Sequence, residues 1–229
     1  MDTKYINDID QFLINKNYSL NKTLERGSHI FSYKKLEDNV LNRIGFIISK
    51  KENNDVFWGF TAYINYLLLE KIVIPILSNN DLIGKALPSD VYNSFYGQNE
   101  FKIPIIDDMS LNNREDIDKI NTIFYNFYDE SIVPFFKKWN NLNVLYDLIK
   151  DKNGREELND ILGQFWQFKK AATLRLCNDK NYQEYMDAIY EREKKYFDED
   201  PNDIDNIRYY NAAKELKEVL DKTEPVYNV

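Results

Sequence analysis

Cysteine and histidine are almost missing from this 229-residue sequence, which contains one of each. Cys177 has no second cysteine with which to form an internal disulfide. It follows Leu174 and Leu176 on an apolar helical face, where a small buried residue is the expected role. Because His29 is the only histidine, a zinc site built from several histidines is excluded. Its place in an expected strand favours the role of a surface or half-buried strand residue over that of a catalytic base.

Glycine is also scarce, and long apolar runs are absent. The seven glycines are spread along the chain and form no P-loop, GxGxxG or GxSxG motif, which disfavours nucleotide chemistry. The longest apolar stretch, Tyr66 to Leu77, is interrupted by Glu70 and Lys71 and falls short of the roughly 20 residues that cross a bilayer. The N-terminus does not resemble a signal peptide. We therefore expect a cytoplasmic protein with no membrane span, no cofactor and no metal.

Acidic residues outnumber basic ones by 38 to 30, which gives a formal net charge of -8. The electrostatic field of a net negative chain repels phosphate backbones, so nucleic acid is a poor candidate partner. Adjacent lysines, such as Lys137 and Lys138, form isolated pairs that are typical of solvated surface. The hydrophobic fraction of 43% and the aromatic fraction of 15% provide enough material for one large domain or two small ones.

One acidic run, from Asp198 to Asp205, superficially resembles a calcium-binding loop. An EF-hand loop needs glycine at its sixth position and a bidentate glutamate at its twelfth. Counted from Asp198, those positions hold Asp203 and Tyr209. The run is therefore expected to be a solvated loop between helices that caps the helix after it.

The first half of the chain predicts a helix followed by strands. Ile6, Ile9 and Phe12 recur at helical spacing within Tyr5 to Asn15. Short runs of branched and aromatic residues, separated by polar connectors, then predict consecutive antiparallel strands joined as a meander. These runs are His29 to Tyr33, Ile44 to Ile48 and Val56 to Tyr63.

The middle of the chain is harder to assign. Leu67 to Leu77 favours a helix over a buried strand, and Pro75 predicts that this helix is short or breaks before that residue. Residues 78 to 112 contain several Pro, Gly, Asn and Asp, and they predict an irregular connection. Phe101 to Ile106 is a β-like island that could form an edge strand.

The second half predicts helices, because apolar residues repeat at three- and four-residue spacing. The expected segments are 113–129, one starting at 132, 142–149, 155–177, 181–197 and 204–222. The fold class is therefore α+β, with an N-terminal helix and antiparallel sheet followed by an all-helical region. The expected division is 1–110 for the helix and sheet and 111–229 for the helices, which would pack on the first region as one unit.

The candidate binding residues are aromatic. Interfaces are enriched in aromatic side chains, and irregular segments often carry recognition. Tyr92, Phe95 and Tyr96 lie among polar residues outside any periodic pattern, while most other aromatics are expected in the core. The candidate binding surface consists of Trp58, Tyr63, Tyr92, Phe95 and Tyr96.

Three groups of segments resemble a bacterial family of unknown function whose members begin with a helix and an antiparallel sheet and finish with helices. The groups are Asn17 to Leu20 with Ile30 to Tyr33, then Ile132 to Trp139, and finally Lys169 to Leu174 with Tyr182 and Tyr185. Proteins of this appearance are found among the immunity proteins of bacterial toxin systems, so the resemblance implies such a role. It carries no catalytic signature and no functional residues, and residues 78 to 112 lack a match.

The leading hypothesis is a cytoplasmic protein-binding module, either an immunity or a regulatory protein, that presents an acidic surface with aromatic anchors to a more basic protein. Two alternatives stay open: an enzyme whose site is built from scattered carboxylates and tyrosines, and a structural subunit of a homo-oligomer. A deep polar pocket with perturbed carboxylates would favour the enzyme. A large apolar interface around a two-fold axis would favour the homo-oligomer.

Overall fold

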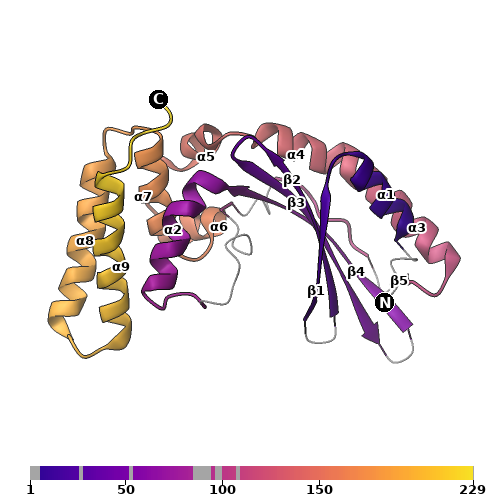
Figure 1. The fold of residues 1–229 in the computed structure, drawn as a ribbon, viewed down its shortest axis with the longest axis horizontal. Helices are drawn as coiled ribbons and strands as arrows, with labels where there is room; N and C mark the ends of the chain where they lie inside the picture. The colour runs from indigo at the N-terminus through magenta and orange to yellow at the C-terminus, as the bar shows by residue number, and fades with distance from the viewer. Residues whose placement is uncertain are drawn as a thin grey trace. The chain divides into compact units, whose positions relative to one another are not determined.

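The structure is a computed structural model that describes residues 6–25, 28–51, 54–84, 94–95, 100–106 and 109–228. An N-terminal helix, an antiparallel sheet and a helical C-terminal region follow one another, which confirms the α+β fold class (Figure 1). The elements are α1 (Asn7–Asn15), β1 (Ser19–Glu25), β2 (Ser28–Glu37), β3 (Val40–Lys51), β4 (Asn54–Tyr66), α2 (Leu67–Asn79), β5 (Met109–Ser110), α3 (Arg114–Phe127), the π-helical turn η3 (Tyr128–Ile132), α4 (Val133–Lys138), α5 (Leu142–Ile149), α6 (Arg155–Leu162), α7 (Trp166–Leu176), α8 (Tyr182–Glu199) and α9 (Ile204–Asp221).

The chain divides into two compact units that interleave along the sequence. The sheet unit comprises residues 1–64 and 97–140, and the helical unit comprises residues 65–96 and 141–229. Elements from both sides of residue 110 enter each unit: α3, η3 and α4 belong to the sheet unit, and α2 belongs to the helical unit.

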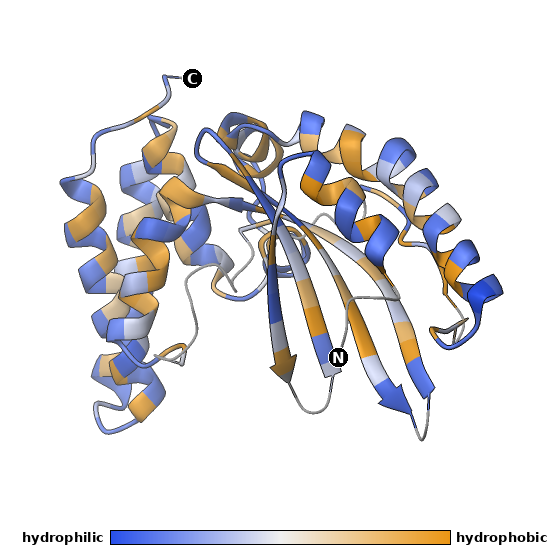
Figure 2. Ribbon diagram, turned by 45° about the vertical axis from the view of Figure 1, so that its right-hand side comes forward, coloured by the Kyte–Doolittle hydropathy of each residue, from blue (hydrophilic) through white to orange (hydrophobic). Residues whose placement is uncertain are grey.

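The sheet unit contains one five-stranded sheet in the order β1-β2-β3-β4-β5. Neighbouring strands run antiparallel, with Leu20 of β1 opposite Tyr33 of β2 and Phe31 of β2 opposite Phe46 of β3. The expected meander is therefore confirmed, and hydrophobic and hydrophilic bands alternate along its strands (Figure 2). Helices α1, α3 and α4 lie along one face of this sheet (Figure 1).

A chain of aromatic rings forms the core between the sheet and these helices. Phe46 stacks on Phe31 with ring centroids 4.8 Å apart, and Phe60 lies 5.1 Å from Phe124 of α3. Phe12 of α1 meets Phe124 edge to face at 5.9 Å. Offset and edge-to-face pairs of this kind add about 0.5–1.5 kcal/mol each to the free energy of burial. The helical spacing of α1 and the two-residue period of the strands thus bury their aromatics in one cluster.

Two details of the sheet unit differ from the expectations. The edge strand is β5, which pairs with Val56 and Phe57 of β4, whereas Phe101 to Ile106 forms no strand. Pro104 lacks a backbone N–H for a ladder, and Ile105 is 87% exposed, so this segment gains little by pairing. The helix expected over 113–129 ends as an α-helix at Phe127 and continues through η3 into α4.

In the helical unit, α7 is the central element. It contacts α2, α5, α6, α8 and α9, and its residues Ala171 and Ala172 are fully buried. Small side chains let neighbouring helices approach closely, which explains why α7 can be surrounded. Helices α8 and α9 form an antiparallel hairpin and confirm the segments expected over 181–197 and 204–222 (Figure 1).

Two expectations for the helical unit were wrong. Helix α2 runs through Pro75 to Asn79 and does not break before the proline. Pro75 and Lys71, whose carbonyl loses its helical N–H partner, both lie on the exposed side of α2, where water can replace the missing bond. The segment 155–177 is two helices, because Gly163 ends α6 with a φ of 69° and Phe165 starts α7 with a φ of 61°.

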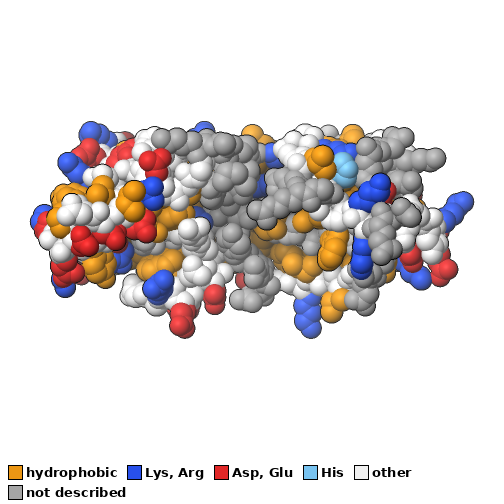
Figure 3. Space-filling model, turned by 90° about the horizontal axis from the view of Figure 1, so that it is seen from below, with side chains coloured by type: hydrophobic (Ala, Val, Ile, Leu, Met, Phe, Trp, Pro, Cys, Tyr) orange, Lys and Arg blue, Asp and Glu red, His pale blue; other side chains and the backbone are white. Residues whose placement is uncertain are grey.

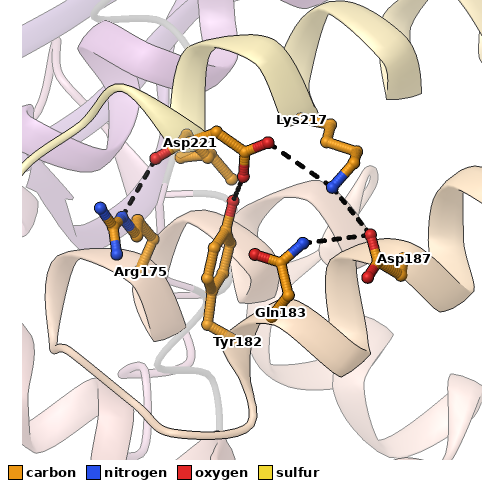
Figure 4. A network of polar contacts seen from close by, with 7 residues as sticks. Arg175, Tyr182, Gln183, Asp187, Lys217 and Asp221 are labelled. Atoms are coloured by element: carbon orange, nitrogen blue, oxygen red, sulfur yellow. Dashed lines mark hydrogen bonds and ion pairs between the residues drawn. The ribbon is translucent and has the colours of Figure 1, made fainter.

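A polar network fixes the hairpin end nearest the C-terminus (Figure 4). The Tyr182 hydroxyl donates to Asp221 at 3.0 Å, and Lys217 bridges Asp187 and Asp221 at 2.7 and 3.5 Å. Arg175 of α7 donates through Nε to the Leu220 carbonyl at 3.0 Å. The ammonium of Lys217 lowers the pKa of Asp187, so these pairs favour the charged forms at neutral pH.

Candidate functional site

The site begins with an irregularity in β4. Phe57 and Phe60 both pack on Phe46, with ring centroids 5.5 and 6.0 Å away, so both point to the helix-covered side. Strict alternation cannot place residues three apart on one face, and one extra residue must be accommodated between them. Gly59 does so with a φ of 122°, a conformation that L side chains rarely adopt. The resulting bulge turns Trp58 to the opposite face, where it is 58% exposed.

Neighbouring side chains show the register on that opposite face. The Arg43 guanidinium lies 5.9 Å from the ring centroid of Tyr63. A Cβ added to Gly45 would come within 3.0 Å of Thr61 Cγ2, so β3 carries a glycine where there is little room for a side chain. We call this surface the open sheet face. Its described side chains include Ile30, Ser32, Lys34 and Leu36 of β2, Leu41, Arg43 and Ile47 of β3, and Trp58, Thr61 and Tyr63 of β4.

The open sheet face combines exposed apolar groups with positive charge. Trp58, Ile47 and Leu36 are 58%, 40% and 58% exposed. Lys34 and Arg43 face each other across β2 and β3, and none of the ten side chains named above is acidic. Hydrophobic side chains gather on the strand-bearing part of the surface seen in Figure 3.

The five candidate binding residues are distributed unevenly. Trp58 and Tyr63 share the open sheet face. Phe95 is 2% exposed and belongs to the core of the helical unit. Tyr92 and Tyr96 lie outside the described residues. Sequence reasoning did not select Ile47. The alternation of β3 contained the signal, since it places Ile47 on the face opposite to that of Phe46 and Ile48.

The helical unit contains a buried polar cluster around Glu70. The Glu70 carboxylate accepts Asn65 Nδ2 at 2.7 Å and Ser94 Oγ at 2.5 Å, and Ser94 Oγ also accepts the Tyr66 N–H at 2.8 Å. Burial lowers the pKa of Lys169 to about 8, while the Glu70 charge opposes that shift. Each of these groups has a hydrogen-bond partner, so the cluster joins α2, Ser94 and α7 as a structural network.

The remaining titratable candidates have structural roles. Cys177 is fully buried, and burial raises the pKa of its thiol to about 12, which keeps it protonated and unreactive. His29 is half-buried in β2. In the acidic run, the Asp203 side chain caps α9 by accepting the N–H groups of Asp205 and Asn206, both at 2.9 Å. Among the described residues, no group of three or more His, Cys, Asp or Glu side chains could hold a metal ion.

The fold defines an α+β protein whose sheet has helices along one face and an exposed tryptophan on the other. No protein-family model, no curated protein and no solved structure matches this chain. Across the described part of the chain, none of the helices is both long enough and apolar enough to span a membrane.

Proposed function

We propose that this protein is a protein-binding module and that the open sheet face receives the partner. The observation that carries the proposal is Trp58, which the Gly59 bulge turns away from the core and leaves 58% exposed. Burying a tryptophan at an interface removes about 150–250 Å² of surface from water, and tryptophan is enriched among residues that dominate binding energy. An exposed tryptophan on a sheet face beside Ile47 is therefore a natural anchor point.

Charge defines the kind of partner that fits. Lys34 and Arg43 lie opposite each other on this face, on two neighbouring strands. Complementary charges steer encounter and fix the orientation of a complex. The occupant that matches is a protein segment that places an aromatic or aliphatic side chain on Trp58 and acidic side chains toward Lys34 and Arg43. An immunity protein of a toxin system is one member of this class, and the resemblance of the sequence to such proteins favours it.

Selection from random peptides displayed on phage tests the proposal directly. We expect the enriched peptides to carry an apolar anchor flanked by Asp or Glu. The substitution Trp58→Ala should weaken their binding at least about tenfold, because a central tryptophan anchor contributes about 2 kcal/mol or more. Lys34→Glu should also weaken binding, and its effect should shrink as salt is added, because salt screens surface charges.

Leu24→Ala provides the matched control. Leu24 is 66% exposed, more than Trp58, and its place in β1 opposite His29 puts it on the other side of the sheet. It should leave peptide binding unchanged, and circular dichroism should show all three variants folded. Enrichment of basic peptides, or equal binding to the wild type and to Trp58→Ala, would refute the proposal.

A further inference from the structure

A second site lies in the helical unit, where α6, α7, α8 and α9 border a cavity of about 580 Å³. Small-molecule sites usually have volumes of about 300–1,000 Å³. The cavity is lined by residues of these four helices and of the short connection between α6 and α7, all within one compact unit.

The apolar part of the cavity wall is aromatic. Phe165, Trp166, Tyr196 and Tyr209 line it, and no aliphatic hydrophobic side chain does. Tyr196 is 46% exposed, and the rings of Phe165 and Tyr209 are 6.3 Å apart. A lining without Leu, Ile, Val or Met does not suit a lipid or another flexible apolar ligand. Flat rings favour a ligand that is itself a ring with an apolar face.

The backbone is strained where it shapes this cavity. Phe165 has a φ of 61° and Gly163 a φ of 69°, and together they make the tight turn between α6 and α7. A left-handed conformation is unusual for a bulky residue. Strained residues of this kind cluster at binding and active sites, where the surrounding structure holds them in place. Here the left-handed Phe165 directly precedes Trp166, and both residues line the cavity.

Uncommitted polar side chains converge on the same cavity. The side chains of Arg155, Gln164 and Gln167 line it and make no hydrogen bond or ion pair within the part of the chain that the structure describes. The Glu193 residue is 7% exposed, and Arg192 donates to its Oε1 at 2.9 and 2.5 Å. Convergent polar groups without internal partners are what fix a ligand's orientation in a small-molecule site.

The charges of the lining balance. The lining contains two arginines, Arg155 and Arg192, and two carboxylates, Glu193 and Asp205. Arginine and the amide N–H groups donate hydrogen bonds, while carboxylates and amide oxygens accept them. A hydroxyl group does both, so a ring that carries several hydroxyls can use this mixture, whereas a strongly charged ligand would leave half of it unmatched.

From these observations we infer that the cavity binds a neutral, polyhydroxylated ring: a free sugar, a glycan end or the sugar of a nucleoside. The ring's C–H face stacks on Trp166 or Tyr196, and its hydroxyls bond to Arg155, Gln164 and Gln167. This inference concerns the helical unit and does not depend on the open sheet face.

Ligand-observed NMR and calorimetric titration of the full chain test it, with neutral pentoses, hexoses, N-acetylhexosamines, their disaccharides and nucleosides as probes. At least one class should bind with a Kd of about 10 mM or tighter. Tyr196→Ala, which removes a half-exposed wall, should weaken binding at least about fivefold, and Gln164→Ala about threefold. Trp58→Ala in the other unit is the matched control and should bind as the wild type does.

Three results would overturn the inference. One is no binding by any neutral probe up to that concentration. Another is clear preference for phosphorylated counterparts of the probes, which would point to an anion site around Arg155. The last is binding that persists unchanged in both Tyr196→Ala and Gln164→Ala while circular dichroism shows the variants folded.

Discussion

The sheet unit and the helical unit differ in where they place charge. The sheet unit has 16 acidic and 14 basic residues, while the helical unit has 22 acidic and 16 basic residues, so most of the net charge of -8 belongs to the helices. The acidic residues crowd around the end of the α8–α9 hairpin (Figure 3). The exposed tryptophan lies instead on the open sheet face, the face that also carries Lys34 and Arg43. The average charge of a chain therefore says little about the sign at any one surface.

The two units also build their cores differently. The sheet unit relies on stacked aromatic rings between a sheet and helices, and Phe31, Phe46 and Phe57 are nearly or fully buried. The helical unit packs alanines at helix contacts and buries the oppositely charged Glu70 and Lys169, whereas the buried charged residue among those described in the sheet unit is Asp10. A ring cluster depends on volume, whereas a core with buried polar groups depends on keeping every hydrogen bond. The following predictions test this difference, starting with the largest effect.

Removing one buried ring from each core should cost the most. Phe46→Ala in the sheet unit and Phe168→Ala in α7 each leave a cavity, and each should lower the free energy of unfolding by about 3–5 kcal/mol. Hydrogen exchange should then accelerate mainly in the unit that carries the substitution, because each unit has its own core. Denaturant titration and exchange mass spectrometry measure both quantities. Equal acceleration across both units for either variant would show a single cooperative unit.

A smaller, pH-dependent effect should follow from buried tyrosine–carboxylate pairs. The Tyr33 hydroxyl donates to Asp10 Oδ1 at 2.9 Å in a buried position, and burial together with that bond raises the pKa of Tyr33 well above its ordinary value. A tyrosine whose pKa is higher in the folded state contributes stability below pH about 10, and that stability is lost as the pH rises further. Tyr33→Phe should lower stability at pH 7 by about 1–3 kcal/mol and make the decline above pH 10 shallower.

The helical unit offers the comparison for this substitution. Tyr182 donates to Asp221 at 3.0 Å, but the pair is only partly buried. Tyr182→Phe should therefore lower stability at pH 7 by about 0.5–1.5 kcal/mol, less than Tyr33→Phe. Denaturant titrations at pH 7 and at several pH values above 9 measure both variants. An effect of Tyr182→Phe as large as that of Tyr33→Phe would mean that burial does not control the difference.

The periodic elements could be predicted from the sequence, and the exceptions could not. Helices α1, α8 and α9 followed from apolar spacing, and β2, β3 and β4 from branched and aromatic runs. The strand β1 was not assigned, because Ser19, Asn21 and Thr23 make it look like a polar connector. The path of α2 through Pro75 depends on that residue being on the solvent side, which is a property of the packed helix.

The candidate site shows the same division. Trp58 could be selected as an aromatic in a strand, but alternation counted from Phe60 would place it in the core, whereas alternation counted from Phe57 would place it outside. The positive φ of Gly59 decides between the two, and a glycine inside a strand does not reveal which way a bulge turns its neighbours. The cavity near Trp166 was not found, because its walls come from four helices and its shape from the break at Gly163.

The smallest expected effect is on the rate at which the Cys177 thiol reacts, and this rate reports on the helical unit separately from the sheet unit. Cys177 is the one thiol in the chain, lies fully buried in the helical unit and has a pKa raised to about 12 by burial. In native protein at pH 8 its reaction with a thiol reagent should be at least about 100-fold slower than in denaturant, because the thiol must first become exposed. Phe168→Ala should speed this labelling, and Phe46→Ala should change it far less. If Phe46→Ala accelerates labelling as much as Phe168→Ala does, the loss of one ring in the sheet unit opens the helical unit as well, and the contrast between two separately stabilised cores does not hold.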